Sequence, residues 1–378
     1  MRILLLADIH IGSIKDTNYV YEILTSIIDK EIIFGKTDLV VILGDYFHRL
    51  FKVNEEYVSC AVNVMNYLIR ACKRSKTKIR IVYGTESHEM GQYKLFNYHL
   101  SSKHIDMKLF DSVTEECIDG KNILYLPEEY INSKEEQYAS TLYDAKKHYD
   151  YIFGHGVIEE GMPMAVIGGA KSNEKQTPKF KAGELSEKGN LVIFGHYHCY
   201  TQMKDNVYYL GSLFRDSFGE ETPKGYGIID NDQFEFIENK DAYVYKTYEF
   251  NIDSKIYEDQ NELMKSIDKI KKENEGIFNG DQTGKIRMVF KTPENIDPSF
   301  RENLKSIIFN DKYLVPLIKT ESNELIDEVK ESIEDEYDFI LDNSLPITDK
   351  IYRYINKTYD NNMSLEELTS YINDPLEI

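Results

Sequence analysis

Five short apolar segments of this sequence are each followed closely by aspartate or histidine, and this pattern constrains the fold most strongly. The segments lie at residues 2–7, 38–43, 79–83, 151–153 and 191–194. Short, continuously apolar runs are typical of strands that are buried on both faces. Helical periodicity at 19–28 and 57–72 lies between some of these segments. The alternation predicts an α/β fold in which helices cover a sheet.

The side chains that follow the five segments are types that bind metals: Asp8, His10, Asp45, His48, His88, His155, His196 and His198. Ligands of open α/β sheets bind outside the carboxyl ends of the strands, so these groups can converge on one crevice. Side chains at i and i+2 of an extended backbone point the same way, which lets His196 and His198 face one site. An isolated pair of this kind is as consistent with packed, hydrogen-bonded core histidines as with metal ligands. Its repetition at five strand ends favours a metal centre.

Imidazole and carboxylate ligands without thiolates favour Mn, Fe or Zn in a two-metal centre over calcium or structural zinc. Asp45 is the expected bridging ligand. Two metals about 3.5–4 Å apart can lower the pKa of a bridging water and hold the oxygens of a phosphoryl group. The sequence therefore predicts phosphoester hydrolysis.

Composition narrows the possible partners and the compartment. With 45 Lys and Arg against 65 Asp and Glu, the net charge is −20, which excludes nucleic-acid binding through a diffuse positive surface. No apolar run approaches the ~20 residues that span a bilayer, so no membrane contact is expected. The N-terminal apolar run reads as a buried strand and not as a signal peptide. Four cysteines without CxxC spacing indicate a reducing compartment, with the cytoplasm as the default.

Two groups of basic residues could offset the negative charge locally. Residues 70–80 hold six Lys or Arg, which we interpret as a solvated helix end. Between the fourth and fifth apolar segments, a loop carries Lys171, Lys175, Lys179 and Lys181. This loop is expected near the crevice, so we expect these lysines to contact substrate phosphates.

The five strand-end motifs resemble those of the calcineurin-like metallophosphoesterase superfamily. In chain order they are D-x-H, G-D-x-x-H, G-x-x-x-H-E, G-H-G and G-H-x-H. Within the superfamily the chain is similar to SbcD-type DNA repair exonucleases, which work with a coiled-coil ABC ATPase. His48, the segment Tyr209–Glu220 and the following Lys224-Gly225 carry this closer resemblance. It covers roughly residues 1–250.

The resemblance implies a role for each motif residue. One metal would be held by Asp8, His10, Asp45 and His198, and the other by Asp45, His155 and His196. His88 would stabilise the transition state or protonate the leaving oxygen, and His48 would position His88 or the substrate phosphate. Arg215 would join the loop lysines in binding substrate. Glu89 either orients His88 or a ligand, or is a solvated loop carboxylate.

The third motif departs from the family. Where the family has Gly-Asn-His, with the asparagine as a neutral ligand of the second metal, this chain has Gly84-Thr85-Glu86-Ser87-His88. Ser87 is the first candidate for the missing ligand, and Thr85 and Glu86 are the alternatives. A hydroxyl is a weaker ligand than an amide oxygen, whereas Glu86 would add charge.

The resemblance implies an architecture as well: a metallophosphoesterase β-sandwich flanked by helices, with a small α+β capping domain and C-terminal helices. The expected boundaries are 1–250 for the nuclease domain, 251–320 for the DNA-capping domain, 321–345 for an acidic linker and 346–378 for a helical segment that binds the ATPase. A β-α-β pattern at 286–319 and an amphipathic helix containing Leu263, Ile267 and Ile270 agree with the second domain. Anchors on the last segment would be Tyr352, Ile355, Leu365, Leu368 and Ile372. These side chains could equally pack on their own domain.

The leading hypothesis is a DNA exonuclease/endonuclease subunit that acts in repair, recombination or replication with two divalent metal ions, Mn²⁺ first. Its expected partners are DNA, an SbcC-type ATPase and a second copy of the chain, in the cytoplasm of a bacterial cell or phage-infected host. One alternative is a phosphodiesterase or phosphatase of the same superfamily that acts on small molecules, RNA or phosphoproteins. The other is a catalytically weak scaffold for DNA ends.

Overall fold

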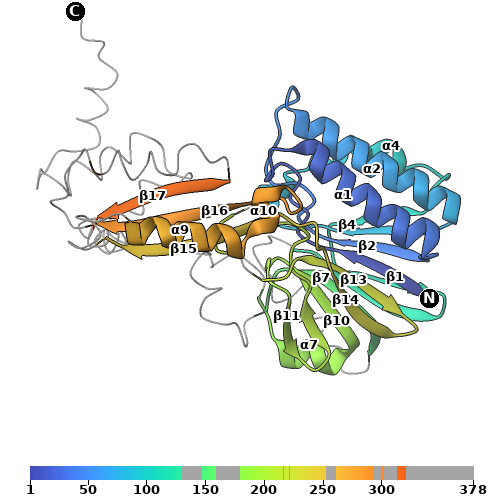
Figure 1. Ribbon diagram of the computed structural model, residues 1–378. Helices are drawn as coiled ribbons and strands as arrows, with labels where there is room; N and C mark the ends of the chain where they lie inside the picture. Colours follow the sequence, from blue (N-terminus) through green and yellow to red (C-terminus); the bar gives the residue numbers. More distant parts are fainter. Residues whose placement is uncertain are drawn as a thin grey trace, which may run out of the picture. The chain divides into compact units, whose positions relative to one another are not determined.

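The computed structural model of the chain (Figure 1) describes residues 1–128, 147–158, 179–215, 217–220, 222–252, 261–292, 300 and 313–320. The chain divides into two compact units. Unit 1 comprises Met1–Thr247 and Asn274–Ile286, and unit 2 comprises Tyr248–Glu273 and Arg287–Ile378. No helix among the described residues is long and apolar enough to cross a membrane.

Unit 1 contains a six-stranded mixed sheet in the order β14-β13-β1-β2-β3-β4. Its strands are β1 (Arg2–Leu6), β2 (Leu39–Leu43), β3 (Lys78–Val82), β4 (Met107–Phe110), β13 (Gly225–Asp230) and β14 (Gln233–Glu238). Strands β1 to β4 run parallel, and β13 and β14 add an antiparallel edge. The two edge strands follow one another in the chain without an intervening helix.

A second six-stranded sheet has the order β11-β12-β10-β7-β6-β5. Its strands are β5 (Thr114–Ile118), β6 (Lys121–Leu126), β7 (Tyr149–His155), β10 (Gly189–Gly195), β11 (Thr201–Lys204) and β12 (Val207–Tyr209). The four inner strands are parallel, and β5 and β11 are antiparallel edges. A short pair, β8 (Val157–Ile158) with β9 (Lys179–Phe180), lies outside both sheets.

Strand β1 shows why its sequence is apolar at every position. Ile3 and Leu5 belong to the core between the two sheets, whereas Leu4 and Leu6 belong to the core under the helices. All four side chains are at most 2% exposed. Burying such a side chain stabilises the fold by about 1.5–3 kcal/mol, so both faces of the strand are needed for packing. The two facing sheets give the sandwich that the resemblance implied.

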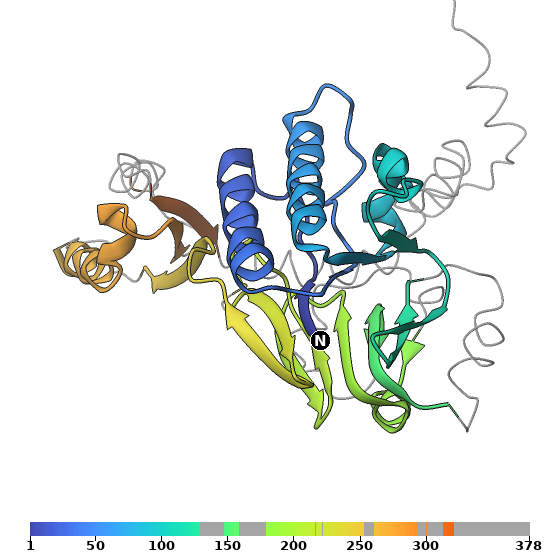
Figure 2. The ribbon, with the colours of Figure 1, turned by 90° about the vertical axis from the view of Figure 1, so that its right-hand side faces the viewer.

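Helices cover the first sheet on the side away from the second sheet (Figure 2). The two long ones are α1 (Thr17–Ile28) and α2 (Glu56–Ser75). Helix α1 begins where Asp16 accepts a hydrogen bond from the Tyr19 backbone N–H at 3.0 Å, which satisfies one free donor of the first turn. The shorter elements of this layer are η1 (Asp29–Phe34), α3 (Glu86–Glu89), η2 (Gln92–Phe96) and α4 (Asn97–Leu100). Helix α7 (Ala182–Lys188) contributes Ala182 and Leu185 to a further core with residues of β6, β7 and β10.

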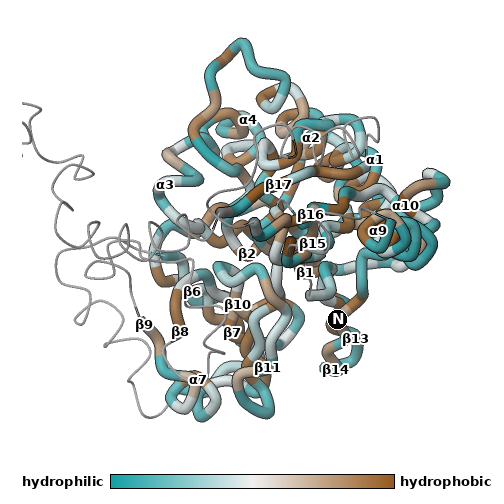
Figure 3. The backbone as a smooth tube through the Cα atoms, turned by 60° about the vertical axis from the view of Figure 1, so that its left-hand side comes forward, coloured by the Kyte–Doolittle hydropathy of each residue, from teal (hydrophilic) through white to brown (hydrophobic). Residues whose placement is uncertain are grey.

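Hydrophobic stretches gather along the strands of the two sheets, and hydrophilic stretches lie mainly on the outer turns (Figure 3).

A separate three-stranded sheet has the order β15-β16-β17. Its strands are β15 (Val244–Asn251), β16 (Gly284–Thr292) and β17 (Leu314–Thr320), and along the chain the helices α9 (Asn261–Glu273) and α10 (Glu275–Asn279) come between β15 and β16. Helix α9 buries Leu263, Ile267 and Ile270, which confirms the predicted amphipathic helix.

Strands β16 and β17 confirm the two strands of the predicted β-α-β unit. The helix expected between them lies outside the described residues, apart from Phe300. The predicted acidic linker and the predicted C-terminal helices also lie outside the described residues.

Candidate metal centre

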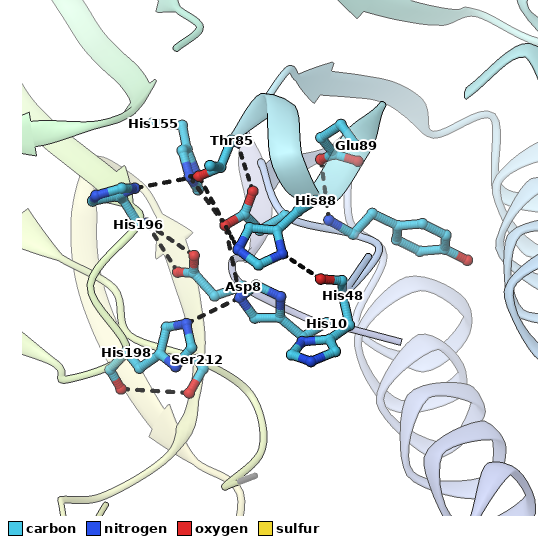
Figure 4. A network of polar contacts seen from close by, with 12 residues as sticks. Asp8, His10, His48, Thr85, His88, Glu89, His155, His196, His198 and Ser212 are labelled. Carbon is cyan, nitrogen blue, oxygen red and sulfur yellow. Dashed lines mark hydrogen bonds and ion pairs between the residues drawn. The ribbon is translucent and has the colours of Figure 1, made fainter. Parts of the chain in front are cut away.

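Strand ends from both sheets of unit 1 meet at one site (Figure 4). The first sheet supplies the residues that follow β1, β2 and β3, and the second sheet supplies those that follow β6 and those at the ends of β7 and β10. The side chains brought together are Asp8, His10, Asp45, His48, Thr85, His88, Glu128, His155, His196 and His198. Nine of the ten are aspartate, glutamate or histidine, as expected at a site for cations.

The backbone turns sharply where the strands end. Asp8 and His10 both have φ of 47°, Asp45 has 49°, and His196 has 101°. Such left-handed conformations cost non-glycine residues on the order of 1–3 kcal/mol each and concentrate at functional sites. They are held here by specific hydrogen bonds: the His196 N–H donates to Asp8 Oδ1 at 2.9 Å, and the His10 N–H donates to the Asp45 carbonyl at 2.9 Å.

Two glycines of the strand-end motifs let the sheets approach each other. A Cβ on Gly44 would lie 2.2 Å from His155 Nδ1, and Gly44 also has φ of 77°. A Cβ on Gly195 would lie 2.2 Å from the Leu43 carbonyl oxygen. Both separations are too short for any side chain. The glycines that precede Asp45 and His196 are therefore required by close packing of the strand ends.

The first donor group contains Asp8, His10 and His198. The Nε2 atoms of His10 and His198 lie 3.0 Å apart, and His10 Nε2 lies 3.7 Å from Asp45 Oδ2. Burial lowers the pKa of His10 well below its usual range, which favours the neutral imidazole that can bind a metal. Two imidazoles and two carboxylates around one point form a donor set that suits Mn²⁺, Fe²⁺ or Zn²⁺.

The second donor group contains His155, His196 and a residue that the sequence analysis missed, Glu128. His155 Nε2 lies 3.4 Å from Asp45 Oδ2, so the Asp45 carboxylate faces both groups. His155 Nδ1–H donates to the Leu43 carbonyl oxygen at 2.8 Å, which fixes the ring with Nε2 facing the site. Glu128 lies just after the buried residues 123–126 of β6, so a search for glutamate as well as aspartate and histidine after each apolar segment would have found it.

The imidazoles balance the charge of buried carboxylates. Burial alone would lower the pKa of His155, but Asp45 and Asp8 raise it to about 10. Burial would likewise raise the pKa of Asp45, but His155 and His10 hold it below its usual range. A divalent cation neutralises the same carboxylates as the proton on His155 does, and metal binding would therefore release that proton.

His88 lies beside the shared carboxylate. Its Nε2 is 4.0 Å from Asp45 Oδ2, and its side chain is 29% exposed. Its Nδ1 contacts the backbone carbonyl of His48. His48 therefore orients His88 through its main chain, and the two rings lie 5.8 Å apart between centroids.

The additional residues of the altered third motif form helix α3. The His88 and Glu89 N–H groups donate to the Thr85 carbonyl, which closes one helical turn and brings His88 to the site. Ser87 is exposed. The hydroxyl that contacts the donor groups belongs to Thr85, whose Oγ1 lies 3.2 Å from Asp45 Oδ2 and 3.3 Å from His155 Nε2. The structure therefore corrects the first candidate, Ser87, because the hydroxyl beside the donor groups is that of Thr85, one of the two alternatives.

Arg215 makes its hydrogen bonds within its own chain. Its Nε donates to the Glu220 carbonyl at 2.8 Å, and its two terminal nitrogens donate to the carbonyls of Thr222 and Tyr243. Each of the three guanidinium nitrogens thus holds a loop of the chain itself, and contact of Arg215 with substrate stays a prediction. Lys181 is exposed, and its Nζ lies 3.8 Å from Glu184 Oε1. Lys171, Lys175 and the side chain of Lys179 lie outside the described residues.

Glu220 and Lys224, which belong to the stretch on which the closer resemblance rests, hold His198 in place. Buried Lys224 donates to the His198 carbonyl at 2.8 Å and to Ser212 Oγ at 2.9 Å. Its Nζ also lies 2.7 Å from a carboxylate oxygen of Glu220, whose other oxygen is 3.4 Å from His198 Nδ1. Contacts of this kind fix the orientation of a metal-binding imidazole.

Glu89 is fully buried, so its interpretation as a solvated carboxylate is wrong. Its Oε1 accepts hydrogen bonds from the Tyr46 backbone N–H at 3.2 Å and from the Tyr93 hydroxyl at 3.1 Å. It therefore fixes the peptide that follows Asp45. Burial and the charge of Asp45 raise its pKa to about 8 from an ordinary value near 4.5.

Replacing Glu89 by glutamine is expected to flatten the pH dependence of folding stability between about pH 4.5 and 8. In that window the folded chain keeps a proton on Glu89 that the unfolded chain loses, so stability of the native chain falls as pH rises, by up to about 1.4 kcal/mol per pH unit from this group. Urea denaturation in chelator at pH 5, 6.5 and 8 measures the difference. Glu187→Gln, the same change at an exposed position of α7, is the control. Equal slopes for Glu89→Gln and the native chain would contradict this account.

Comparison with known protein families identifies one family that this chain matches. The family model described as calcineurin-like phosphoesterase matches residues 1–200. No curated protein matches the sequence. One matching chain of a solved structure covers 63% of this chain and 98% of its own length, with 10% sequence identity and a TM-score of 0.37. The family match spans every donor residue described above.

Proposed function

Because this chain belongs to the calcineurin-like phosphoesterase family, we propose that it is a Mn²⁺-dependent DNA nuclease of the SbcD type. The family and the buried clusters of histidine and carboxylate side chains make it a metal-dependent phosphoesterase. Beyond that activity, we propose DNA as the substrate and Mn²⁺ as the cation. The proposed partners are an SbcC-type coiled-coil ABC ATPase and a second copy of the chain.

The position of Asp45 is the observation that carries this proposal. Its Oδ2 lies 3.7 Å from His10 Nε2 on one side and 3.4 Å from His155 Nε2 on the other. One carboxylate can therefore serve two cations, with Asp8, His10 and His198 around the first and His155 and His196 around the second. When bound, such cations would activate water and stabilise the charge that develops on the phosphoryl oxygens.

His88 would give a proton to the oxygen that leaves the phosphorus. Its ring lies beside the donor groups, with the centroid 4.7 Å from that of His10. The contact of Nδ1 with the His48 carbonyl fixes the ring, and Nε2 points toward the site. Positioned acids of this kind contribute about 10²–10⁴-fold to rate.

DNA as the substrate is supported by the sequence resemblance and by local charge. An exposed ion pair such as Lys181 with Glu184 contributes little to stability. Lys181 could therefore exchange Glu184 for a backbone phosphate at little cost. Bound cations would reduce the repulsion between the polyanionic substrate and a chain of net charge −20.

The test uses the full chain, stripped with chelator and reloaded with Mn²⁺. The substrates are linear double-stranded DNA, single-stranded DNA and bis(p-nitrophenyl) phosphate, with and without the ATPase and ATP. We expect Mn²⁺-dependent DNA degradation that a His88→Ala chain, purified identically, does not show. Hydrolysis of the small ester without any DNA cleavage, even with the ATPase, would assign the activity to a different phosphodiester. No hydrolysis of any substrate would favour the DNA-end scaffold.

A further inference from the structure

We propose that Glu128 is a ligand of the second cation, so that this chain has a carboxylate where chains with a Gly-Asn-His motif have an amide. This inference rests on the two-cation centre proposed above and concerns the ligands of that centre. It explains how a chain without the asparagine keeps its second donor group complete.

The backbone brings Glu128 to the altered third motif. Glu128 follows β6 of the second sheet, and its N–H donates to the carbonyl of Tyr83 at 3.1 Å. Tyr83 directly follows β3 of the first sheet. This bond places the side chain from one sheet next to Thr85 on the other, where the family's asparagine would begin.

One oxygen of the carboxylate is surrounded by donor atoms. Glu128 Oε2 lies 3.5 Å from His155 Nε2, 3.4 Å from His196 Nδ1 and 3.0 Å from Thr85 Oγ1. The side chain is 1% exposed. The two separations from imidazole nitrogens are longer than the usual 2.7–3.2 Å of a hydrogen bond. Ligand atoms that each lie about 2.1 Å from one ion are about 3.0–3.4 Å apart at octahedral to tetrahedral angles, which is close to what is seen.

The charge of Glu128 suits a divalent cation better than an amide does. Asp8, Asp45 and Glu128 are each at most 2% exposed, so three carboxylates share one buried site. Buried carboxylates require nearby positive charge. With Asp45 shared between two sites, Glu128 adds a full negative charge to the second. We therefore expect this chain to hold its second cation more tightly than an amide ligand would allow.

Thr85 keeps the two carboxylates of the second group in place. Its N–H donates to Asp45 Oδ1 at 2.7 Å, and its hydroxyl lies 3.0 Å from Glu128 Oε2 and 3.2 Å from Asp45 Oδ2. The hydroxyl can donate to only one oxygen at a time. We assign Thr85 as a positioning residue between Glu128 and Asp45.

Metal binding by the full chain tests the assignment without reference to activity. Bound Mn²⁺ is measured by elemental analysis after equilibrium dialysis, and paired ions by their spin-coupled paramagnetic resonance spectrum. The native chain is expected to bind two ions. Glu128→Gln puts an amide of equal size in place of the carboxylate and is expected to weaken binding of the second ion at least about 10-fold. Loss of a group that only orients a ligand already lowers metal affinity by about 10–100-fold. Glu187→Gln is the matched control.

The outcomes separate this assignment from the nuclease proposal. Unchanged binding of two ions by Glu128→Gln would overturn the role of Glu128, whatever the activity. Two ions in the native chain without DNA cleavage would overturn the nuclease and leave Glu128 standing. If the variants do not fold, a crystal structure of the native chain with Mn²⁺ decides. A Glu128 oxygen bonded to the second ion supports the assignment, and a water in that place with Glu128 turned away refutes it.

Discussion

Replacing Asp45 by asparagine is expected to lower kcat for phosphodiester hydrolysis by more than about 100-fold and to remove at least one bound cation. Loss of a group that merely orients a metal ligand costs about 10–100-fold, so loss of the ligand shared by both donor groups should cost more. The substitution keeps the size of the side chain. It removes the charge that His10 and His155 face at 3.7 and 3.4 Å.

Steady-state kinetics on bis(p-nitrophenyl) phosphate and elemental analysis of the dialysed protein measure these effects together. Asp205→Asn makes the same change at an exposed turn between β11 and β12 and should leave both quantities unchanged. An Asp45→Asn chain that keeps two cations and more than a tenth of the native kcat would show that Asp45 does not bridge the two groups.

Replacing His88 by glutamine is expected to lower kcat for DNA cleavage by about 10²–10⁴-fold while leaving bound metal unchanged. His88 lies beside the donor groups, 4.0 Å from Asp45 Oδ2, and is held through the His48 carbonyl. A group that protonates the leaving oxygen matters most when that oxygen is a poor leaving group. The loss should therefore be much smaller for bis(p-nitrophenyl) phosphate, whose leaving group needs little protonation.

Comparing the two substrates with one variant identifies the role of His88. Substitution of His104, an exposed histidine, by glutamine is the matched control. Equal losses on DNA and on the p-nitrophenyl ester would mean that His88 stabilises the phosphoryl charge and does not protonate the leaving oxygen. A parallel loss of bound Mn²⁺ would make it a ligand.

The sheets and most of the centre could be predicted because the relevant signals are local. Strands such as β1 and β2 are apolar on both faces, and the residue after each one is read directly from the sequence. Strands β4, β5 and β11 were missed because they are short and partly exposed, with polar residues such as those of Thr114–Ile118. An edge strand buries little, so its sequence is under weak hydrophobic constraint.

The third motif could not be resolved from sequence because its geometry depends on both sheets. Adjacency to His88 favoured Ser87, but the turn of α3 leaves Ser87 exposed and makes Thr85 the residue at the site. Glu128 is 40 residues further along the chain than His88. The contact between the ends of β3 and β6, which belong to different sheets, brings it to the same place.

Titration of the chelator-stripped chain with Mn²⁺ shows whether this phosphodiesterase needs two cations. Hydrolysis of bis(p-nitrophenyl) phosphate is followed against the number of ions bound per chain. We expect negligible activity without metal and a rise that follows occupancy of the second site. Full activity in chelator, or activity that is complete with one bound ion, would contradict this expectation.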